Sequence, residues 1–194
     1  MADRGGIEPR LTPHRAAAPR TAADTLVEWT RDLDEELGAR LDLMDAAGLA
    51  WQPHPDANSP GVTVWHVARW LDILGTRAFT DGSASNELWH TEGWAEATGY
   101  EPGGKGYLGL GALTGYTPDE MRAVPAMDRS ALRAYLGQST RALITQIRWL
   151  DGRLLEPAAL GLTPYQSISG TLQGCFGHVG EIDTLLSLRA RITS

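Results

Sequence analysis

The stretch TVWHVARWL, residues 63–71, places apolar side chains at the three- and four-residue steps of one buried helix face. The stretch GCFGHVGEIDTLLSLR, residues 174–189, has the same period, and each stretch carries one histidine. Ser59 and Pro60 supply an N-cap and a first helical residue ahead of the earlier stretch. We therefore predict one helix at about 60–79 and another at about 167–191.

Two further segments repeat this helical period, at about residues 24–47 and 128–150. The first is followed by WQPHPDANSPG, whose three prolines prevent the helix from continuing. No alternating strand pattern extends beyond a few residues. Four long amphipathic helices predict an all-α fold, a four-helix bundle with a long, partly irregular connection between its second and third helices.

That connection, residues 80–116, is rich in glycine and aromatic residues and has little periodicity, although SNELWHTEGWAEATG can form a helical turn or two. A connection of this length inside a domain is usually functional. Thr117, Pro118 and Glu120 then form a capping box for a short helix that Pro125 ends.

Composition limits the function classes. The 194 residues suit one domain, and a formal charge of −7 without a basic patch argues against nucleic acid as a partner. One cysteine, Cys175, excludes an internal disulfide framework and indicates a reducing compartment, so the expected location is cytoplasmic. Residues 1–22 resemble a flexible tail rather than a signal peptide, residues 23–194 form the domain, and no segment is apolar enough to cross a membrane.

The stretches at 63–71 and 174–189 resemble helices 2 and 4 of the DinB-like superfamily. The middle stretch LWHTEGWAEATGYEPGGKGYLGLGALTGYTPDE resembles a segment of its actinobacterial members, which include mycothiol-dependent enzymes. The similarity covers about residues 24–191. It implies a helical bundle that commonly holds a divalent metal, in a group that includes thiol-dependent transferases and isomerases.

The resemblance also implies a metal site built from one histidine of helix 2 and two histidines, four residues apart, of helix 4. His66 and His178 match two of these ligands, but position 174 is glycine. Two imidazoles alone hold zinc or nickel weakly. Cys175, Glu181 or His90 could supply the missing ligand. Without a third ligand, we expect His66 and His178 to be partly buried imidazoles with hydrogen bonds in the core.

Glycines at 170, 174, 177 and 180 lie within the predicted last helix, where each costs about 1 kcal/mol relative to alanine. Gly170, Gly174 and Gly177 fall on neighbouring positions of one face, so either another helix packs very close to this face, or the face leaves room for a ligand. For the second reading we expect a pocket between helices 2 and 4, under the connection. Its predicted lining is Trp65, Trp70, His90, Trp94, Gly174 and Cys175, although aromatic core packing is the simpler explanation of the tryptophans.

These residues lead to three hypotheses of function. The first is a small-molecule enzyme, a metal- or thiol-dependent transferase, isomerase or lyase, with His66, His178 and Glu181 as catalytic residues. The second is a metal-free protein of the same fold that binds a small apolar ligand or uses a histidine as general acid or base. The third is a bundle whose only role is self-association or partner binding, since the resemblance implies that a homodimer is common. We expect a small molecule as partner, and neither nucleic acid nor membrane.

Overall fold

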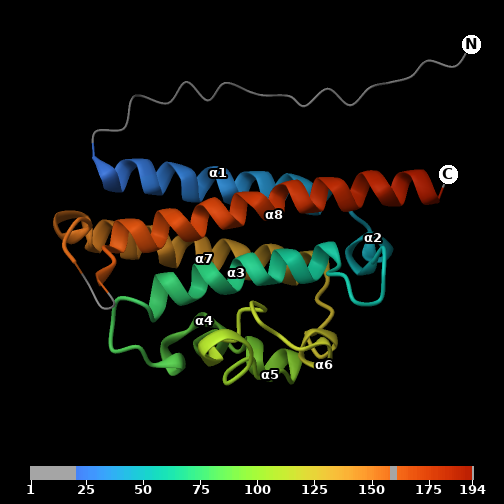
Figure 1. Cartoon of the computed structure of the whole chain (residues 1–194), viewed down its shortest axis with the longest axis horizontal. Helices are drawn as coiled ribbons and strands as arrows, with labels where there is room; N and C mark the ends of the chain where they lie inside the picture. The colour runs from blue at the N-terminus through green and yellow to red at the C-terminus, as the bar shows by residue number, and fades with distance from the viewer. Residues whose placement is uncertain (1–20, 158–160, 194) are drawn as a thin grey trace, which may run out of the picture.

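Four long helices lie side by side and form a bundle in the computed structural model, which describes residues 21–157 and 161–193 (Figure 1). No strand is present in these residues. The all-α prediction is therefore confirmed, whereas the predicted flexible tail lies almost wholly outside the described residues. The four helices are α1 (Ala22–Asp42), α3 (Pro60–Thr76), α7 (Arg129–Trp149) and α8 (Pro164–Ile192).

Side-chain caps fix where the long helices begin. Thr21 and Asp24 form a capping box, so α1 starts at Ala22, two residues before the predicted start. Thr163 and Gln166 form another, which starts α8 at Pro164 rather than at 167. Helix α1 also ends five residues earlier than predicted, because Asp45 caps a separate short helix, α2 (Ala46–Ala50).

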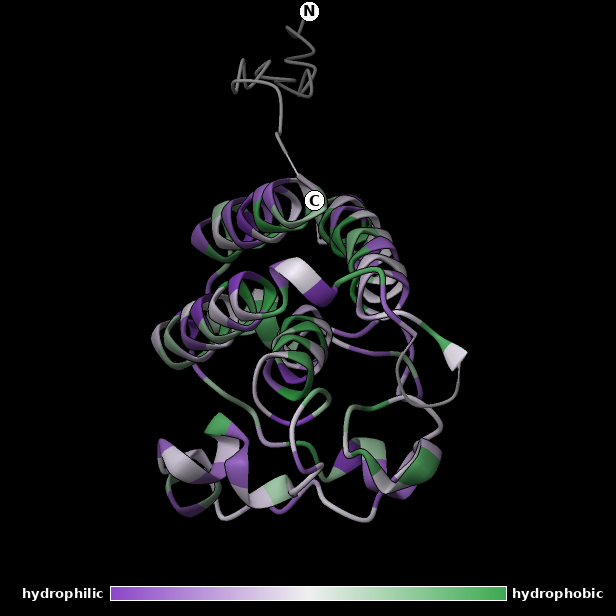
Figure 2. Ribbon diagram, turned by 90° about the vertical axis from the view of Figure 1, so that its left-hand side faces the viewer, coloured by the Kyte–Doolittle hydropathy of each residue, from purple (hydrophilic) through white to green (hydrophobic). Residues whose placement is uncertain are grey.

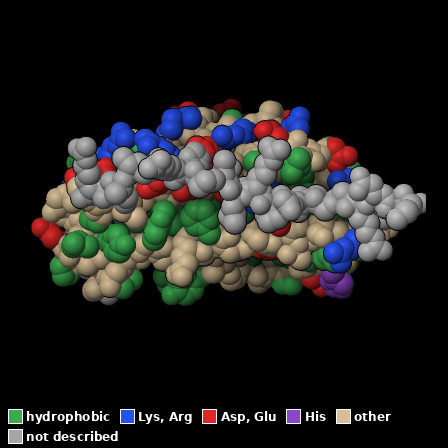
Figure 3. Space-filling view, turned by 90° about the horizontal axis from the view of Figure 1, so that it is seen from above, with side chains coloured by type: hydrophobic (Ala, Val, Ile, Leu, Met, Phe, Trp, Pro, Cys, Tyr) green, Lys and Arg blue, Asp and Glu red, His purple; other side chains and the backbone are tan. Residues whose placement is uncertain are grey.

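The apolar faces of the four helices point toward one another and form a single core (Figure 2). The outer face over α1 and α8 mixes arginine and acidic side chains with scattered hydrophobic ones (Figure 3). None of the described helices is both long enough and apolar enough to span a bilayer. The side chains without any exposed surface include Leu26, Leu33, Leu37, Leu71, Leu136, Leu143, Ile168 and Ile182.

The connection between α3 and α7 forms a second layer on one side of the bundle (Figure 1). Trp89 of this layer is fully buried, and its ring centroid lies 5.9 Å from that of Trp65 and 5.2 Å from that of Tyr135. The capping box predicted at Thr117 and Glu120 is present. The short helices are η1 (Ala84–Asn86), α4 (Leu88–Thr91), α5 (Trp94–Thr98), η2 (Tyr107–Gly109) and α6 (Pro118–Arg122), with η3 (Asp151–Arg153) after α7.

A buried ionic network attaches this layer to the bundle. The fully buried guanidinium of Arg69 on α3 lies 3.2 Å from the Asp72 carboxylate and 2.8 Å from that of Glu87, which precedes α4. Asp72 accepts hydrogen bonds from the backbone N–H groups of Leu88 and Trp89, at 2.8 and 3.0 Å. Burial raises the pKa of Asp72, against the attraction of Arg69. The layer is thus held to α3 by charges that have no access to water.

Arg69→Met should lower the free energy of unfolding by about 3–5 kcal/mol, because it leaves the Asp72 and Glu87 carboxylates buried without their shared cation. Urea denaturation followed by circular dichroism measures the change. As the matched control, Arg122→Met removes an arginine whose side chain is 55% exposed, and should cost less than about 1 kcal/mol. Equal losses in the two variants would contradict a structural role for the network.

Candidate functional site

His66 of α3 and His178 of α8 face each other across the boundary between these helices. Their Nε2 atoms are 3.1 Å apart, and the rings meet edge to face at a centroid distance of 4.7 Å. The two helices run in opposite directions, so the residues that follow His66 face those that precede His178 (Figure 1). His66 is buried, at 6% exposure, whereas the His178 side chain is 30% exposed. Solvent therefore reaches the pair from the His178 side.

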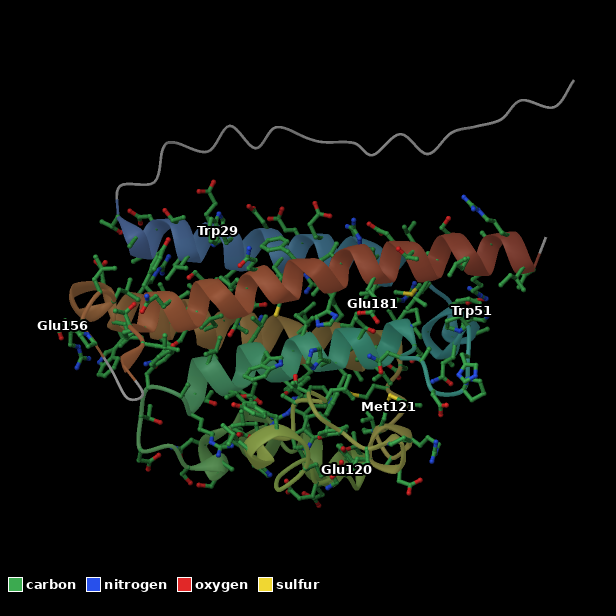
Figure 4. The ribbon with its side chains drawn as sticks, viewed as in Figure 1. Trp29, Trp51, Glu120, Met121, Glu156 and Glu181 are labelled. Atoms are coloured by element: carbon green, nitrogen blue, oxygen red, sulfur yellow. The ribbon has the colours of Figure 1, made fainter. Side chains whose placement is uncertain are left out.

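The second nitrogen of each ring is held by an oxygen. His66 Nδ1 contacts the backbone carbonyl of Ala112 in the connection, and His178 Nδ1 lies 2.7 Å from Glu181 Oε2. Figure 4 shows Glu181 on the side of α8 that faces α3. A carbonyl or carboxylate oxygen only accepts, so each Nδ1 carries a proton and donates it. The two Nε2 atoms, which face each other, are then the atoms left for chemistry.

The charges around the pair determine where an additional proton lies. Burial, and secondly the neighbouring His178, lower the pKa of His66 to about 4. The hydrogen bond from His178 lowers the pKa of Glu181, which is therefore ionised at neutral pH. A proton shared between the two Nε2 atoms is therefore disfavoured on His66, and the ionised Glu181 carboxylate lies on the other side of the pair. The resulting hydrogen-bond chain runs from Glu181 through His178 and His66 to the Ala112 carbonyl.

The connection positions His66 through consecutive backbone carbonyls. Arg69 Nε donates to the carbonyl of Gly111 at 3.2 Å, and the next carbonyl, that of Ala112, meets His66. Leu113 then has a positive φ of 69°, which is uncommon for a residue with a side chain. Ala112 could not be identified from the sequence, because a backbone acceptor has no residue signature, and Arg69 was not singled out there either.

The glycines of α8 face open space. Apart from adjoining residues and backbone of α8 itself, no described atom lies within 4 Å of an ideal Cβ at Gly170, Gly174, Gly177 or Gly180. The prediction that another helix packs closely on these glycines is therefore wrong for the described part of the chain. The other prediction, that this face leaves open space, agrees with the structure. Gly174 lies one turn before His178, so the space adjoins the histidine pair.

Two of the three residues predicted as replacement metal ligands, His90 and Cys175, are not suited to that role. His90 has both ring nitrogens occupied, by the Ala84 carbonyl and the Glu101 carboxylate, each at 2.9 Å. Cys175 is buried, and burial raises the pKa of its thiol to about 12, so it is a neutral thiol rather than a thiolate. Only Glu181, through His178, joins the pair.

The tryptophans expected to line a pocket have separate roles. Trp65 is fully buried in the aromatic cluster with Trp89, and Trp94 Nε1 donates to Gln138 Oε1 at 2.8 Å. Trp70 is partly buried on α3, one turn after His66 on the same helix face. Because α3 and α8 are antiparallel, this turn faces the turn that contains Gly174. Trp70 and Gly174 are therefore predicted pocket residues that lie one helical turn from His66 and from His178, respectively.

The donors at this position do not make a three-ligand metal site. Within residues 21–157 and 161–193, no group of three or more His, Cys, Asp or Glu side chains is arranged to hold an ion. Two Nε2 atoms converge, but Glu181 is bound to His178 Nδ1, and position 174 has no side chain. Structural and catalytic zinc sites have at least three protein ligands. We accordingly derive no chemistry through a metal, and the predicted zinc or nickel remains a question for titration.

A family model described as the DinB superfamily matches residues 28–182 of the chain. Among solved structures, a conserved protein from Enterococcus faecalis matches with a TM-score of 0.69 and 19% identity, over 85% of this chain and 95% of that chain. At this identity the likeness concerns the fold alone. No curated protein matches the chain. The likeness to actinobacterial members stays a prediction.

Gly174→His should create a third ligand, because the open space at Gly174 admits an imidazole at i−4 from His178. Zinc affinity, measured by isothermal titration calorimetry, should rise by orders of magnitude. Gly170→His is the matched control, since position 170 is equally open but lies two turns from His178. If the two variants bind zinc equally, the Nε2 atoms of His66 and His178 do not converge as described.

The depressed pKa of His66 predicts a loss of stability in acid. The unfolded chain binds a proton at His66 near the ordinary value of 6.5, whereas the folded chain does so only near 4. Stability is therefore full above pH 6.5 and falls as the pH drops, by about 2 kcal/mol between pH 7 and pH 5. Urea denaturation across this range should give a smaller pH slope for His66→Gln than for the parent. Identical slopes would mean that His66 titrates normally.

Proposed function

Because the chain belongs to the DinB superfamily, we propose that it is a small-molecule enzyme in which His178 and His66 transfer protons without a metal. The observation that carries this proposal is the 3.1 Å approach of the two Nε2 atoms, each in a ring whose Nδ1 is held by an oxygen. Two imidazoles so oriented share one additional proton, which is the arrangement that general acid and base catalysis needs.

The substrate would enter over Gly174, where α8 has no side chain, and would meet both Nε2 atoms. His178 donates its Nε2 proton to a substrate atom, while the neutral His66 accepts one, so the pair can remove and return a proton in one turnover. Glu181 holds the His178 ring and stabilises its charged form. This chemistry serves isomerisation, elimination by a lyase, or activation of a thiol in a transfer reaction.

We also propose a cytoplasmic location, supported by the single cysteine, which is a free and buried thiol. A small molecule is the proposed partner. The expected homodimer is retained as a proposal that gel filtration and light scattering can decide.

The proton-transfer proposal predicts that the protein accelerates hydrolysis of the activated ester 4-nitrophenyl acetate, which accessible imidazoles attack. His178→Gln should lower the protein-dependent rate at least about tenfold, the lower end of what one acid–base group contributes. Glu181→Gln should lower it less, because it removes the group that orients His178 but leaves the ring in place. The release of 4-nitrophenolate measured by absorbance gives these rates.

His54→Gln is the matched control, because His54 is exposed and pairs with Asp56 away from the site. Removing this ordinary exposed imidazole should lower the rate by less than His178→Gln does. If His178→Gln lowers the rate no more than His54→Gln, the pair is not a reactive centre. A parental rate that disappears with a chelator and returns with zinc or nickel would instead assign the chemistry to an ion, and would contradict the metal-free proposal.

A further inference from the structure

A second concave feature lies at the end of the bundle where α1 ends and α3 and α7 begin. This cleft has a volume of about 830 Å³, within the range of small-molecule sites. Its walls come from the end of α1, helix α2, the first turn of α3 and the segment from α6 to the start of α7. None of His66, His178 and Glu181 lines it. An inference about the cleft therefore does not rest on the function proposed for the histidine pair.

Methionine is concentrated at this cleft. The chain has four methionines, and all except Met1 line the cleft: Met44, Met121 and Met127. Met44 is 1% exposed, while the other two are partly buried against the core, and Met121 lies on the bundle side of α6 in Figure 4. Methionine side chains are flexible and polarisable, and they adapt to apolar ligands of varied shape.

The remaining apolar lining is aliphatic. Leu49 and Val124 are buried, and Val62 is partly buried against the core, so together with the methionines they form an apolar floor. Among the described residues no aromatic side chain lines the cleft. Such a floor fits a flexible hydrocarbon chain better than an aromatic ring, which would find no stacking partner.

The charged groups around the cleft differ in whether a protein partner already satisfies them. The Asp45 carboxylate binds the Gly48 N–H at 2.7 Å and Arg189 at 3.1 Å. Asp128 accepts from Ser130 and from the Ala131 N–H, at 2.7 and 2.8 Å. The two carboxylates are thus occupied by capping and pairing.

The cleft is also lined by two arginines, Arg122 and Arg129, and by a third aspartate, Asp42. Arg122 pairs with Asp119 and Asp56, and Asp42 lies near Arg133, whose pKa it helps to raise. Arg129 alone among the cleft's charges has no partner of opposite sign within the described residues. Its one hydrogen bond to the described residues, from Nη1 to the Asp42 backbone carbonyl, is 3.4 Å long. The exposed guanidinium is therefore available to an anion at the rim.

We propose that this cleft binds an aliphatic carboxylate of medium chain length. The hydrocarbon chain lies on the methionine floor, where each buried CH₂ group adds to the affinity. The carboxylate lies at Arg129, whose planar guanidinium donates two parallel hydrogen bonds to such a group. The polar head thus stays at the rim, near water, and the apolar chain is removed from water.

Decanoate, used below its micelle concentration, is the probe for this site. Protein labelled with ¹³C at the methionine methyl groups gives one nuclear magnetic resonance signal for each methionine. Titration should shift the signals of Met44, Met121 and Met127, with Met1 serving as an internal reference. Signals that do not move, or that move together with Met1, would overturn the proposal.

Arg129→Gln should weaken decanoate binding by about tenfold or more, because it removes a charge-assisted hydrogen bond. Arg148→Gln is the matched control, since Arg148 is an exposed arginine at the other end of α7 and should leave the dissociation constant unchanged. Decyltrimethylammonium, with the same chain and the opposite charge, should bind more weakly than decanoate and gain from Arg129→Gln. Equal affinities of the parent and Arg129→Gln for decanoate, or stronger binding of the cationic probe by the parent, would reject the carboxylate assignment.

Discussion

Arg69 has no access to solvent, so its positive charge must be balanced inside the protein, and this requirement determines how the two layers fit together. Asp72 balances it from the same helix and Glu87 from the connection, so the connection cannot leave the bundle without stranding a buried charge. The same guanidinium holds the Gly111 carbonyl. The next carbonyl, that of Ala112, thereby reaches His66. The buried ionic network thus positions the acceptor that orients the His66 ring.

Much of the bundle could be predicted, because helical periodicity is a local property of the sequence. The four long helices and the pairing of His66 with His178 follow from the spacing of apolar residues and from the family resemblance. The predicted helix ends were less accurate, because Thr21 and Thr163 cap α1 and α8 upstream of the first clear apolar repeats. These boxes are visible in the sequence once the helix starts are known, since each has its polar partner three residues on.

The second layer could not be predicted at the same level. Arg69 and Asp72 interrupt an apolar pattern at i, i+3 spacing, which hints at a buried pair, but nothing local identifies Glu87 as the third member. The surroundings of the α8 glycines could not be predicted from the sequence either, because glycines in a helix suit either a close neighbour or open space. Glu181 was predictable as a partner of His178 from its position one turn away, whereas Ala112 contributes only a backbone oxygen.

The open glycine face has a consequence for motion in α8. Each of Gly170, Gly174, Gly177 and Gly180 gives up about 1 kcal/mol of helix stability relative to alanine, and no described neighbour packs against their missing side chains. We expect local unfolding to begin in these turns, and their amide protons to exchange faster than those of α1 or α3. Because His178 and Glu181 lie among these turns, we expect transient opening of α8 itself to provide a route to the buried imidazole.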